Sequence, residues 1–430
     1  MPVLTTNILI VGGGPSGMAA ALAASSKGAA NVTLIDDNPH LGGQIWRAEL
    51  GRTKSPDAAA LDGKKFNIIN NAQIFAASIP NTLKAETPKG TVEFEYEKLI
   101  LATGARERFL PFPGWTLPGV FGAGGLQALI KGGLNSKNKR IVVAGTGPLL
   151  LVVAEYLKSK GAKVLAIAEQ APAARINKFA FGLWRYPSKV KQGIALKAKI
   201  LEIPYLTDTW VTNCTSPRVS KGKTRTLNDS PLLTRGLSHL GSVTLSQKGK
   251  LRSIDCDYLA IGFHLVPNTE VASLLGCEIQ NSFVTVDEFQ WTTCENVFCA
   301  GEPTGIGGVE ASLVEGKIAG FAATGQFDEA RKLFREREKT RWFGDALNKT
   351  FALRDELKTL ADNETLVCRC EDVEYRRLKP FDSWRTAKLQ TRCGMGSCQG
   401  RVCGAATEFL FDWTVGAARP PIFPVKLENL

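Results

Sequence analysis

Residues 8–17 read Ile-Leu-Ile-Val-Gly-Gly-Gly-Pro-Ser-Gly, an apolar run that breaks into a turn of glycines. The run predicts a buried strand, and the small residues after the turn predict the start of a helix. Gly12 permits a tight turn, Gly14 lets the backbone approach a pyrophosphate, and Gly17 lets the helix pack closely on the strand. The free N–H groups at the start of that helix then face the phosphates. The stretch is therefore typical of a dinucleotide-binding turn.

A second apolar run, residues 31–36, ends in Asp36. In dinucleotide-binding folds an acid about 20 residues beyond the glycine turn accepts hydrogen bonds from the ribose hydroxyls. The order of strand, turn, helix, strand and acid is thus present, which is more specific than a glycine motif alone.

Three later segments also bring small residues to places where backbone passes close to a ligand: 42–44, 102–104 and 297–302. Together with residues 11–17 and Asp36, they resemble the flavin-binding signatures of flavoprotein oxidoreductases that have two dinucleotide-binding domains. The resemblance implies an FAD site formed by Gly12, Gly14, Pro15, Ser16, Gly17, Asp36, Gly43, Gln44, Ala102, Thr103, Gly104, Gly301 and Glu302.

The last of these segments departs from the family in one residue. The family's motif usually ends in Gly-Asp, and that carboxylate holds the ribityl chain of FAD; here Glu302 takes the place. The helix expected over 308–316 would direct its N-terminus at the flavin ring, where the positive end of the helix favours negative charge. We interpret Glu310 and Glu315 as solvated helix acids rather than flavin ligands.

A second nucleotide-like unit lies between the two halves of the flavin domain, with a strand and turn at 140–150 and a further strand at 163–169. Leu150 occupies the third glycine position, which weakens the fingerprint. A structural copy of the fold without a ligand is the favoured interpretation. The alternatives are an NAD(P) site with Glu169 on a ribose, or another adenine nucleotide bound without turnover.

Composition limits the class of protein. The chain has 430 residues and a net charge of +12, but Lys and Arg are spread along it and no aromatic-basic module indicates nucleic acid binding. The basic surface is interpreted as solvated, with an acidic subunit or an anionic membrane as alternative partners. Because no apolar run is long enough to span a membrane, and no cleavable leader is apparent, we expect a cytoplasmic protein that associates with a membrane at most peripherally, at its inner face.

Ten cysteines divide into two groups. Five are scattered among apolar strands and are expected to be inert core residues, and five lie between 368 and 403. The latter form Cys-x-Cys and Cys-x4-Cys pairs among glycines, which suits four thiolates around one small metal cluster. Structural zinc is the competing interpretation, although Cys-x-Cys is tighter than usual zinc spacing.

This segment resembles the small helical [2Fe–2S] domain of bacterioferritin-associated ferredoxin. The resemblance implies Cys368, Cys370, Cys398 and Cys403 as ligands. Cys393 is the spare cysteine, and it lies near enough in sequence to exchange roles with one of them.

Over essentially its whole length the chain resembles the alpha or A subunit of multimeric FAD-dependent, dye-linked amino-acid dehydrogenases, a group that includes opine oxidase, proline and hydroxyproline dehydrogenases and hydrogen cyanide synthase. The resemblance rests on the flavin signatures, the Cys-Arg-Cys-Glu and Thr-Arg-Cys-Gly-Met-Gly-Ser-Cys-Gln-Gly-Arg-Val-Cys-Gly motifs and a Pro-rich tail at 419–425.

It implies an electron-transferring subunit of an enzyme that oxidises CH–NH or CH–NH2 donors. The substrate would be oxidised on a D-amino-acid-oxidase-like flavoprotein partner. The further partners would be a quinone or other acceptor and a small ferredoxin-like subunit. We assign no catalytic acid or base to this chain.

Two other functions are compatible with the motifs. One is a self-contained NAD(P)H-dependent flavoprotein reductase with the cluster as its electron outlet. The other is an assembly subunit that carries flavin without electron flow.

The predicted fold is α/β, with two Rossmann-like dinucleotide-binding domains of the pyridine-nucleotide-disulfide oxidoreductase type and a small C-terminal helical [2Fe–2S] domain. The expected divisions are 1–125 with 275–330 for FAD, 126–274 for the NAD(P)-binding-like unit, 331–360 for a helical linker, and 361–430 for the cysteine domain with its tail. The polar composition of 207–250 predicts a hairpin-rich insertion.

Overall fold

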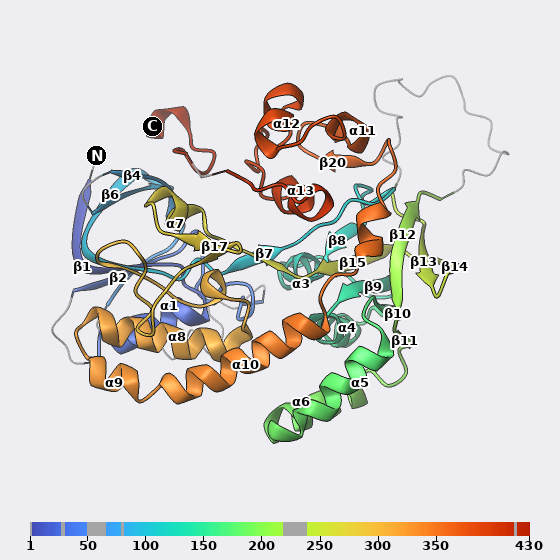
Figure 1. Cartoon of the computed structure of the whole chain (residues 1–430), viewed down its shortest axis with the longest axis horizontal. Helices are drawn as coiled ribbons and strands as arrows, with labels where there is room; N and C mark the ends of the chain where they lie inside the picture. Colours follow the sequence, from blue (N-terminus) through green and yellow to red (C-terminus); the bar gives the residue numbers. More distant parts are fainter. Residues whose placement is uncertain (1, 27–30, 50–65, 79–80, 218–238, 417–418) are drawn as a thin grey trace.

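The computed structural model describes residues 2–26, 31–49, 66–78, 81–217, 239–416 and 419–430 (Figure 1). These residues form two sheets built mainly of parallel strands, helices packed against them, and a small helical region near the C-terminus. The predicted α/β class is confirmed. Residues 218–238 of the insertion predicted at 207–250 lie outside the described residues.

The first sheet has the strand order β3-β2-β1-β6-β5-β4, and β19 pairs with β6. The predicted strand at 8–11 is part of β1, and the run predicted at 31–36 contains β2. The two strands run parallel, with Ile8 beside Val32 and Val11 beside Ile35. The antiparallel hairpins β4–β5 and β5–β6 close one side. The strands are β1 Val3–Val11, β2 Val32–Ile35, β3 Asn67–Ile69, β4 Gln73–Ser78, β5 Thr82–Thr87, β6 Gly90–Leu101 and β19 Val297–Cys299.

Both faces of this sheet are buried, as expected for parallel strands that read as continuous apolar runs. Leu9 and Leu101 belong to the core on one face, whereas Ile10 and Ile100 belong to the core on the other. This burial fixes the register in which β1 and β6 end, and hence the position of the glycine turn beside residues 102–104.

Helices α1 (Pro15–Ala24) and α8 (Gly308–Ala323) pack on one face of the first sheet with their backbones in close approach. A Cβ on Gly316 would lie 2.1 Å from the carbonyl oxygen of Ser16, and one on Gly320 would lie 2.4 Å from that of Ala20. Only glycine permits this contact, which carries the start of α8 to the start of α1.

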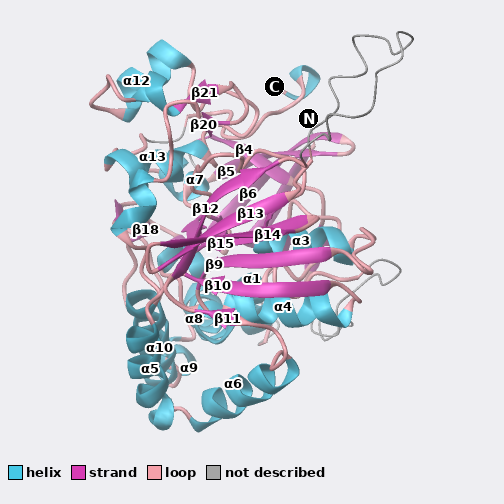
Figure 2. Cartoon of the chain, turned by 90° about the vertical axis from the view of Figure 1, so that its right-hand side faces the viewer, coloured by secondary structure: helices cyan, strands magenta, loops and turns pink. Residues whose placement is uncertain are grey.

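The middle sheet is parallel throughout, with the strand order β11-β10-β9-β15-β8. Figure 2 shows β9, β10 and β15 side by side, with α6 projecting beneath them. Strand β8 comes before residue 125, so we propose that the middle unit begins at this strand. The elements are β8 Val120–Gly122, α3 Ala123–Lys131, β9 Arg140–Thr146, α4 Leu149–Ser159, β10 Lys163–Glu169, α5 Ala173–Gly182, η1 Leu183–Arg185, α6 Pro187–Lys199, β11 Tyr205–Leu206 and β15 Tyr258–Phe263.

A three-stranded antiparallel sheet, β12-β13-β14, covers the middle sheet, and its β13–β14 pair is a hairpin as the polar composition predicted. The strands of this sheet are β12 Thr209–Thr215, β13 Ser242–Gln247 and β14 Lys250–Asp255. Short strand pairs and a helix connect the two large sheets: β7 Ala105–Glu107 with β16 Leu265–Pro267, β17 Ile279–Gln280 with β18 Phe283–Val284, and α7 Glu270–Leu274.

After α8 the chain forms a long helical linker and then the cysteine module, by which we mean residues 361–416. The module packs on both larger units. Trp115 Nε1 donates to the Leu366 carbonyl (2.6 Å) and Arg108 donates to that of Ala405 (3.1 Å), while Val402 and Phe409 pack against the core beneath the middle sheet. The elements are η2 Glu302–Thr304, α9 Phe327–Arg331, α10 Phe334–Thr350, η3 Asp355–Thr359, β20 Leu366–Cys368, β21 Val373–Glu374, α11 Tyr375–Leu378, α12 Trp384–Thr391, α13 Cys403–Phe411 and η4 Leu427–Asn429.

The Pro-rich tail, residues 419–430, returns to the first sheet. Ile422 is buried in that sheet's core and donates its N–H to the Phe75 carbonyl (2.8 Å), and Thr91 Oγ1 donates to the Asn429 carbonyl (2.6 Å). The tail therefore connects the cysteine module to the first unit through these contacts. None of the described helices has the length and apolarity needed to cross a membrane.

Candidate functional site

The flavin cradle, defined as residues 12–17, 36, 42–44, 102–104, 301 and 302, is formed where β1, β2, β6 and β19 end. Gly12 has a φ of 109°, and a Cβ there would lie 2.2 Å from the Ala102 carbonyl oxygen, so only glycine fits this crossing. The Gly13 N–H donates to Asp36 Oδ2 (2.5 Å), which holds the turn against the acid at the end of β2. Gly43 lies against Gly14, with 3.9 Å between the Gly43 Cα and the Cβ position of Gly14.

The other wall of the flavin cradle is the turn after β19. Gly301 has a φ of 84°, and its Cβ position lies 2.9 Å from the Ser16 Cβ. Glu302 Oε1 accepts the Gly308 N–H (3.0 Å) at the start of α8. The structure thus brings together all the predicted segments, which are far apart in the sequence; Gln44 is exposed beside Gly43.

Two buried polar atoms in this cradle, Ser16 Oγ and Glu302 Oε2, have no hydrogen-bond partner within the described chain. No heavy atom lies within 4 Å of the Cβ position at Gly104, Gly305 or Gly308, so the backbone there is open to a ligand. Burial raises the pKa of Glu302 to about 7. Open backbone with unpartnered donors and acceptors fits a polar cofactor such as FAD.

Glu315 is a residue of this site for which the prediction was wrong. It is 2% exposed rather than solvated: Oε2 accepts the Gly301 N–H (2.9 Å) and Thr304 Oγ1 (3.1 Å), and Oε1 accepts Arg341 Nε (2.7 Å). Its partners lie 11, 14 and 26 residues away in the chain, and no spacing rule links them. Glu310 is exposed, as predicted, and pairs with Lys189 (2.7 Å). Glu315 therefore holds the Gly301–Thr304 turn.

The middle sheet has the corresponding crevice, defined as the carboxyl ends of β9, β10 and β15. Such a switch point is where a dinucleotide would lie. Here the chain's own residues 351–354 fill it: the Phe351 carbonyl accepts Thr146 Oγ1 (2.9 Å), lies 2.9 Å from His264 Nε2 and accepts Gln170 Nε2 (3.4 Å). The Phe351 ring lies 4.0 Å from the Cβ position of Gly147, over the glycine turn.

Residues 351–354 are called the strap below. Glu169, the acid expected on a ribose, is fully buried beneath this strap. Its two oxygens accept the N–H groups of Gly147 (2.7 Å) and Ala171 (2.8 Å), and desolvation raises its pKa to about 7. Gln170, 1% exposed, accepts the Arg354 N–H (3.2 Å) and fixes the strap from the other side. A crevice filled in this way does not fit NAD(P).

The five late cysteines meet in the cysteine module. The thiols of Cys368, Cys393 and Cys403 lie within 4.8 Å of one another, and all three residues are buried. Cys370, which is exposed, and Cys398 hydrogen-bond to each other. The four predicted ligands therefore fall in two groups, and Cys393 lies with the first. Hydrogen bonds from Cys393 and Cys403 lower the pKa of Cys368 to about 2.

The backbone around these thiols comes from the cysteine loop, residues 392–404. Gly394 and Gly400, with φ of 83° and 79°, turn the loop against the Trp384 ring. Backbone N–H groups of Gly394 and Glu371 hydrogen-bond to Cys368, and those of Gly400 and Val402 to Cys398. Amides of this kind offset thiolate charge. An all-sulfur donor set with such amides fits an iron–sulfur cluster, and also zinc.

The cysteine loop and the flavin cradle are joined by hydrogen bonds. Thr103 Oγ1 donates to the Asn268 carbonyl (2.5 Å), and Asn268 Nδ2 donates back to that of Thr103 (2.9 Å). Arg106 donates to Asn268 Oδ1 (2.7 Å) and, through Nε, to the Arg401 carbonyl (3.2 Å). Four residues thus connect the end of β6 with the turn between Cys398 and Cys403.

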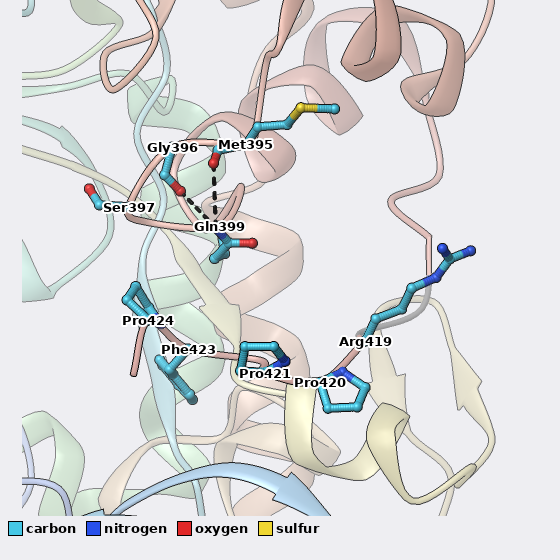
Figure 3. A pocket seen from close by; sticks show the side chains of 9 residues that line it. All are labelled: Met395, Gly396, Ser397, Gln399, Arg419, Pro420, Pro421, Phe423 and Pro424. Atoms are coloured by element: carbon cyan, nitrogen blue, oxygen red, sulfur yellow. Dashed lines mark hydrogen bonds between the residues drawn. The ribbon is translucent and has the colours of Figure 1, made fainter. Parts of the chain in front are cut away.

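The outer side of the cysteine loop borders a hollow of about 450 Å³ beneath the Pro-rich tail (Figure 3). Gln399 turns back there, and its Nε2 donates to the carbonyls of Met395 (3.4 Å) and Gly396 (3.1 Å). The lining residues are Met395, Gly396, Ser397, Gln399, Arg419, Pro420, Pro421, Phe423 and Pro424.

Comparison with known proteins first gives a match to the N-terminal part of this arrangement. Residues 6–197 match the family described as pyridine nucleotide-disulphide oxidoreductase. This part of the chain is therefore similar to a pyridine nucleotide-disulphide oxidoreductase domain. The matched part of this oxidoreductase domain includes both glycine turns, and the family implies FAD and redox chemistry. The predicted two-domain flavoprotein fold is confirmed.

Two relatives extend the match to nearly the whole chain. The HcnB subunit of hydrogen cyanide synthase from Pseudomonas protegens is 29% identical, with 98% of this chain and 97% of that protein covered. The A subunit of opine oxidase from Agrobacterium tumefaciens is 29% identical, with coverage of 99% and 91%. The oxidoreductase chain is a homologue of both, as its motifs predicted.

Solved structures share the fold. L-proline dehydrogenase from P. horikoshii superposes with a TM-score of 0.66 at 19% identity, over 100% of this chain and 80% of that one. Thioredoxin reductase from T. acidophilum gives 0.55 at 18% identity, over 76% of this chain and 99% of that one. The first of these likenesses extends through the cysteine module of the oxidoreductase, whereas the second covers about three quarters of the chain.

Proposed function

We propose that this chain is the electron-transferring FAD and [2Fe–2S] subunit of a multimeric amino-acid or imino-acid dehydrogenase of the opine, proline or hydroxyproline type. The observation that carries the proposal is the bridge of Thr103, Asn268, Arg106 and Arg401 between the flavin cradle and the cysteine loop. The names of the relatives, both subunits of larger enzymes, support it. In the proposal, CH–NH or CH–NH2 oxidation takes place on a D-amino-acid-oxidase-like flavoprotein partner.

When bound, FAD would exchange electrons in pairs and a [2Fe–2S] cluster would pass them singly, so the two together convert one kind of transfer into the other. The task of the chain is positioning. Asp36 and the glycine turn would hold the adenosine and pyrophosphate, and Ser16 and Glu302 offer the unpartnered atoms for the rest of the flavin. Arg106 would keep the cysteine loop beside this cradle.

We propose Cys368, Cys370, Cys398 and Cys403 as the cluster ligands. Cys393→Ser is the matched control for Cys398→Ser because both positions lie on the cysteine loop. We expect Cys398→Ser to abolish the paramagnetic signal of the reduced cluster and Cys393→Ser to retain it. The opposite pattern would exchange their roles, and a full complement of zinc without iron in anaerobically prepared protein would reject the cluster.

The electron outlet of the proposed subunit is the face with exposed Cys370 and the hollow under the Pro-rich tail. A quinone, a small ferredoxin-like subunit or another acceptor would approach there. The strap in the middle crevice argues against the NAD(P)H reductase as the alternative function. Rapid bleaching of the bound flavin by NADH or NADPH in the isolated chain would reinstate that alternative.

The deciding experiment is anaerobic purification with endogenous partners, followed by optical and paramagnetic spectra during titration with proline, hydroxyproline, glycine and opines. We expect a second flavoprotein to copurify and one of these compounds to reduce both chromophores. Absence of a second flavoprotein together with no reduction by any of them would overturn the amino-acid assignment. Unchanged activity of a reconstituted Cys398→Ser complex would favour an assembly role instead. We place the complex in the cytoplasm.

A further inference from the structure

The segment from Ala171 to Leu201, which contains α5, η1 and α6, has an unusual charge. It carries seven Lys and Arg and no Asp or Glu, more than half of the chain's net charge of +12. A solvated surface helix ordinarily mixes both signs to form pairs along its face. A segment with one sign only is suited to a partner that presents the opposite sign everywhere.

The same segment exposes large apolar side chains. Phe181 is 83% exposed, Trp184 71%, Ile194 65% and Leu201 77%. Among the described residues, eight large apolar side chains are more than 60% exposed, and these four lie within 21 residues of one another. Single exposed apolar residues are ordinary, but a concentration of them indicates a contact surface.

The inner side of the segment is seated on the body. Tyr186 stacks on Trp342 of α10 with ring centroids 5.4 Å apart, and Phe179 meets the Phe351 ring edge-on at 6.0 Å. Lys189 pairs with Glu310 (2.7 Å), which fixes the start of α6. The inner side is therefore held by these ring contacts, while no residue of α5 or α6 with a described side chain is fully buried.

We propose that α5, η1 and α6 form a peripheral membrane-binding surface for an anionic phospholipid bilayer. Phe181, Trp184, Ile194 and Leu201 would enter the headgroup boundary. The exposed Lys178, Lys191 and Lys197 would reach the lipid phosphates, whereas Lys189 and Lys199 pair with Glu310 and Glu155 of the body. Lysine suits this position because its apolar stem lies along the boundary while its ammonium group stays in water. Five of the seven cations are Lys, a residue depleted in protein–protein interfaces, which favours lipid over a protein partner.

The location of this surface suits a relay enzyme. In both views α6 projects from the side of the molecule opposite the cysteine module (Figures 1 and 2). Lipid binding through α5 and α6 thus leaves the cysteine loop and the hollow beneath the tail accessible. This proposal does not rest on redox activity, so it fails or holds separately from the proposed function.

The test is co-sedimentation of the full chain with vesicles of phosphatidylcholine alone or with about one third phosphatidylglycerol. We expect binding to the anionic vesicles only, weakened as salt rises because the attraction is screened. Lys178→Glu combined with Lys191→Glu and Lys197→Glu should lower the partition coefficient at least tenfold. The variant that combines Ile194→Ser with Phe181→Ser should also lower the partition coefficient, by a comparable factor, when it is compared with wild type at high salt.

Leu251→Ser is the control, since Leu251 is 70% exposed on β14, outside the segment. It should bind as wild type does. Unchanged flavin content and an unchanged circular dichroism spectrum would show that each variant is folded. The proposal is overturned if wild type ignores anionic vesicles at low salt, or if the charge variant binds them equally well. Loss of a copurifying protein from the variants, with lipid binding intact, would assign the surface to that protein.

Discussion

At the scale of single residues, Glu302 shows how burial changes the chemistry of an acid. Its ordinary pKa of 4.5 is raised to about 7 by desolvation, so the folded chain holds a proton where the unfolded chain has lost it. The free energy of unfolding of the flavin-free chain therefore falls as pH rises from about 4.5 to about 7, by up to about 3 kcal/mol from this group. Glu302→Gln should remove that part of the decrease.

Urea unfolding of both proteins at pH 5 and pH 8 checks this. Glu169 contributes a decrease of the same sign that remains in the variant, because its pKa is also about 7. An equal pH dependence in wild type and Glu302→Gln would contradict the assignment.

Glu315 and Arg341 supply a second prediction at this scale. Arg341→Met leaves the buried Glu315 carboxylate without its cation, which we expect to cost about 1–2 kcal/mol, since the arginine is 39% exposed. The Gly301–Thr304 turn should loosen with it, and FAD content after gel filtration should fall. Arg331→Met, at an exposed pair on α9, should change the free energy of unfolding by less than about 0.5 kcal/mol.

Asp36 and Glu315 show which residues of the site could be predicted from the sequence and which could not. The position of Asp36 beside the glycine turn was predictable because it follows from a fixed order of strand, turn and acid. Glu315 was not predictable, because a helix acid near Gly316 is solvated or buried according to which segment covers it. That segment, α10, is placed by contacts that no local pattern encodes.

At the scale of elements, the crossing of α1 and α8 depends on glycine. Gly316→Ala would place a methyl group 2.1 Å from the Ser16 carbonyl oxygen, so we expect a loss of about 1–3 kcal/mol and a lower melting temperature. Gly193→Ala in α6 is the matched control: nothing lies within 4 Å of its Cβ position, and alanine there should stabilise the helix by about 0.5–1 kcal/mol. Equal melting temperatures for the two variants would refute the packing argument.

Most of the strands and helices could be predicted from the sequence. The apolar runs at 8–11 and 163–169 and the small-residue helix after Pro15 form where their patterns predict. The strap over the middle crevice was not legible. It depends on hydrogen bonds from Thr146 and Gln170 to the backbone of Phe351, about 180 or more residues away, whereas the motif alone predicts an open crevice.

At the scale of the whole molecule, Arg106 contacts two distant parts of the chain. It binds Asn268 and Glu270 (2.8 Å) in one and donates to the Arg401 carbonyl in the other. Arg106→Leu should leave these groups unsatisfied, so that the cysteine module separates more readily from the flavin cradle. We expect hydrogen exchange over residues 398–411 to quicken about tenfold or more, for a loss of about 1.4 kcal/mol or more in local opening. Arg252→Leu on β14, where the arginine is exposed, should leave exchange there unchanged.

The filled crevice of the middle sheet has a practical consequence for handling this protein. Two Rossmann folds suggest two places for an adenine-containing molecule, but residues 351–354 of the chain itself fill one of them. An immobilised triazine dye or AMP resin should therefore retain flavin-stripped material with a stoichiometry of one per polypeptide. Free FAD should displace it in a single step, and NADH should elute nothing.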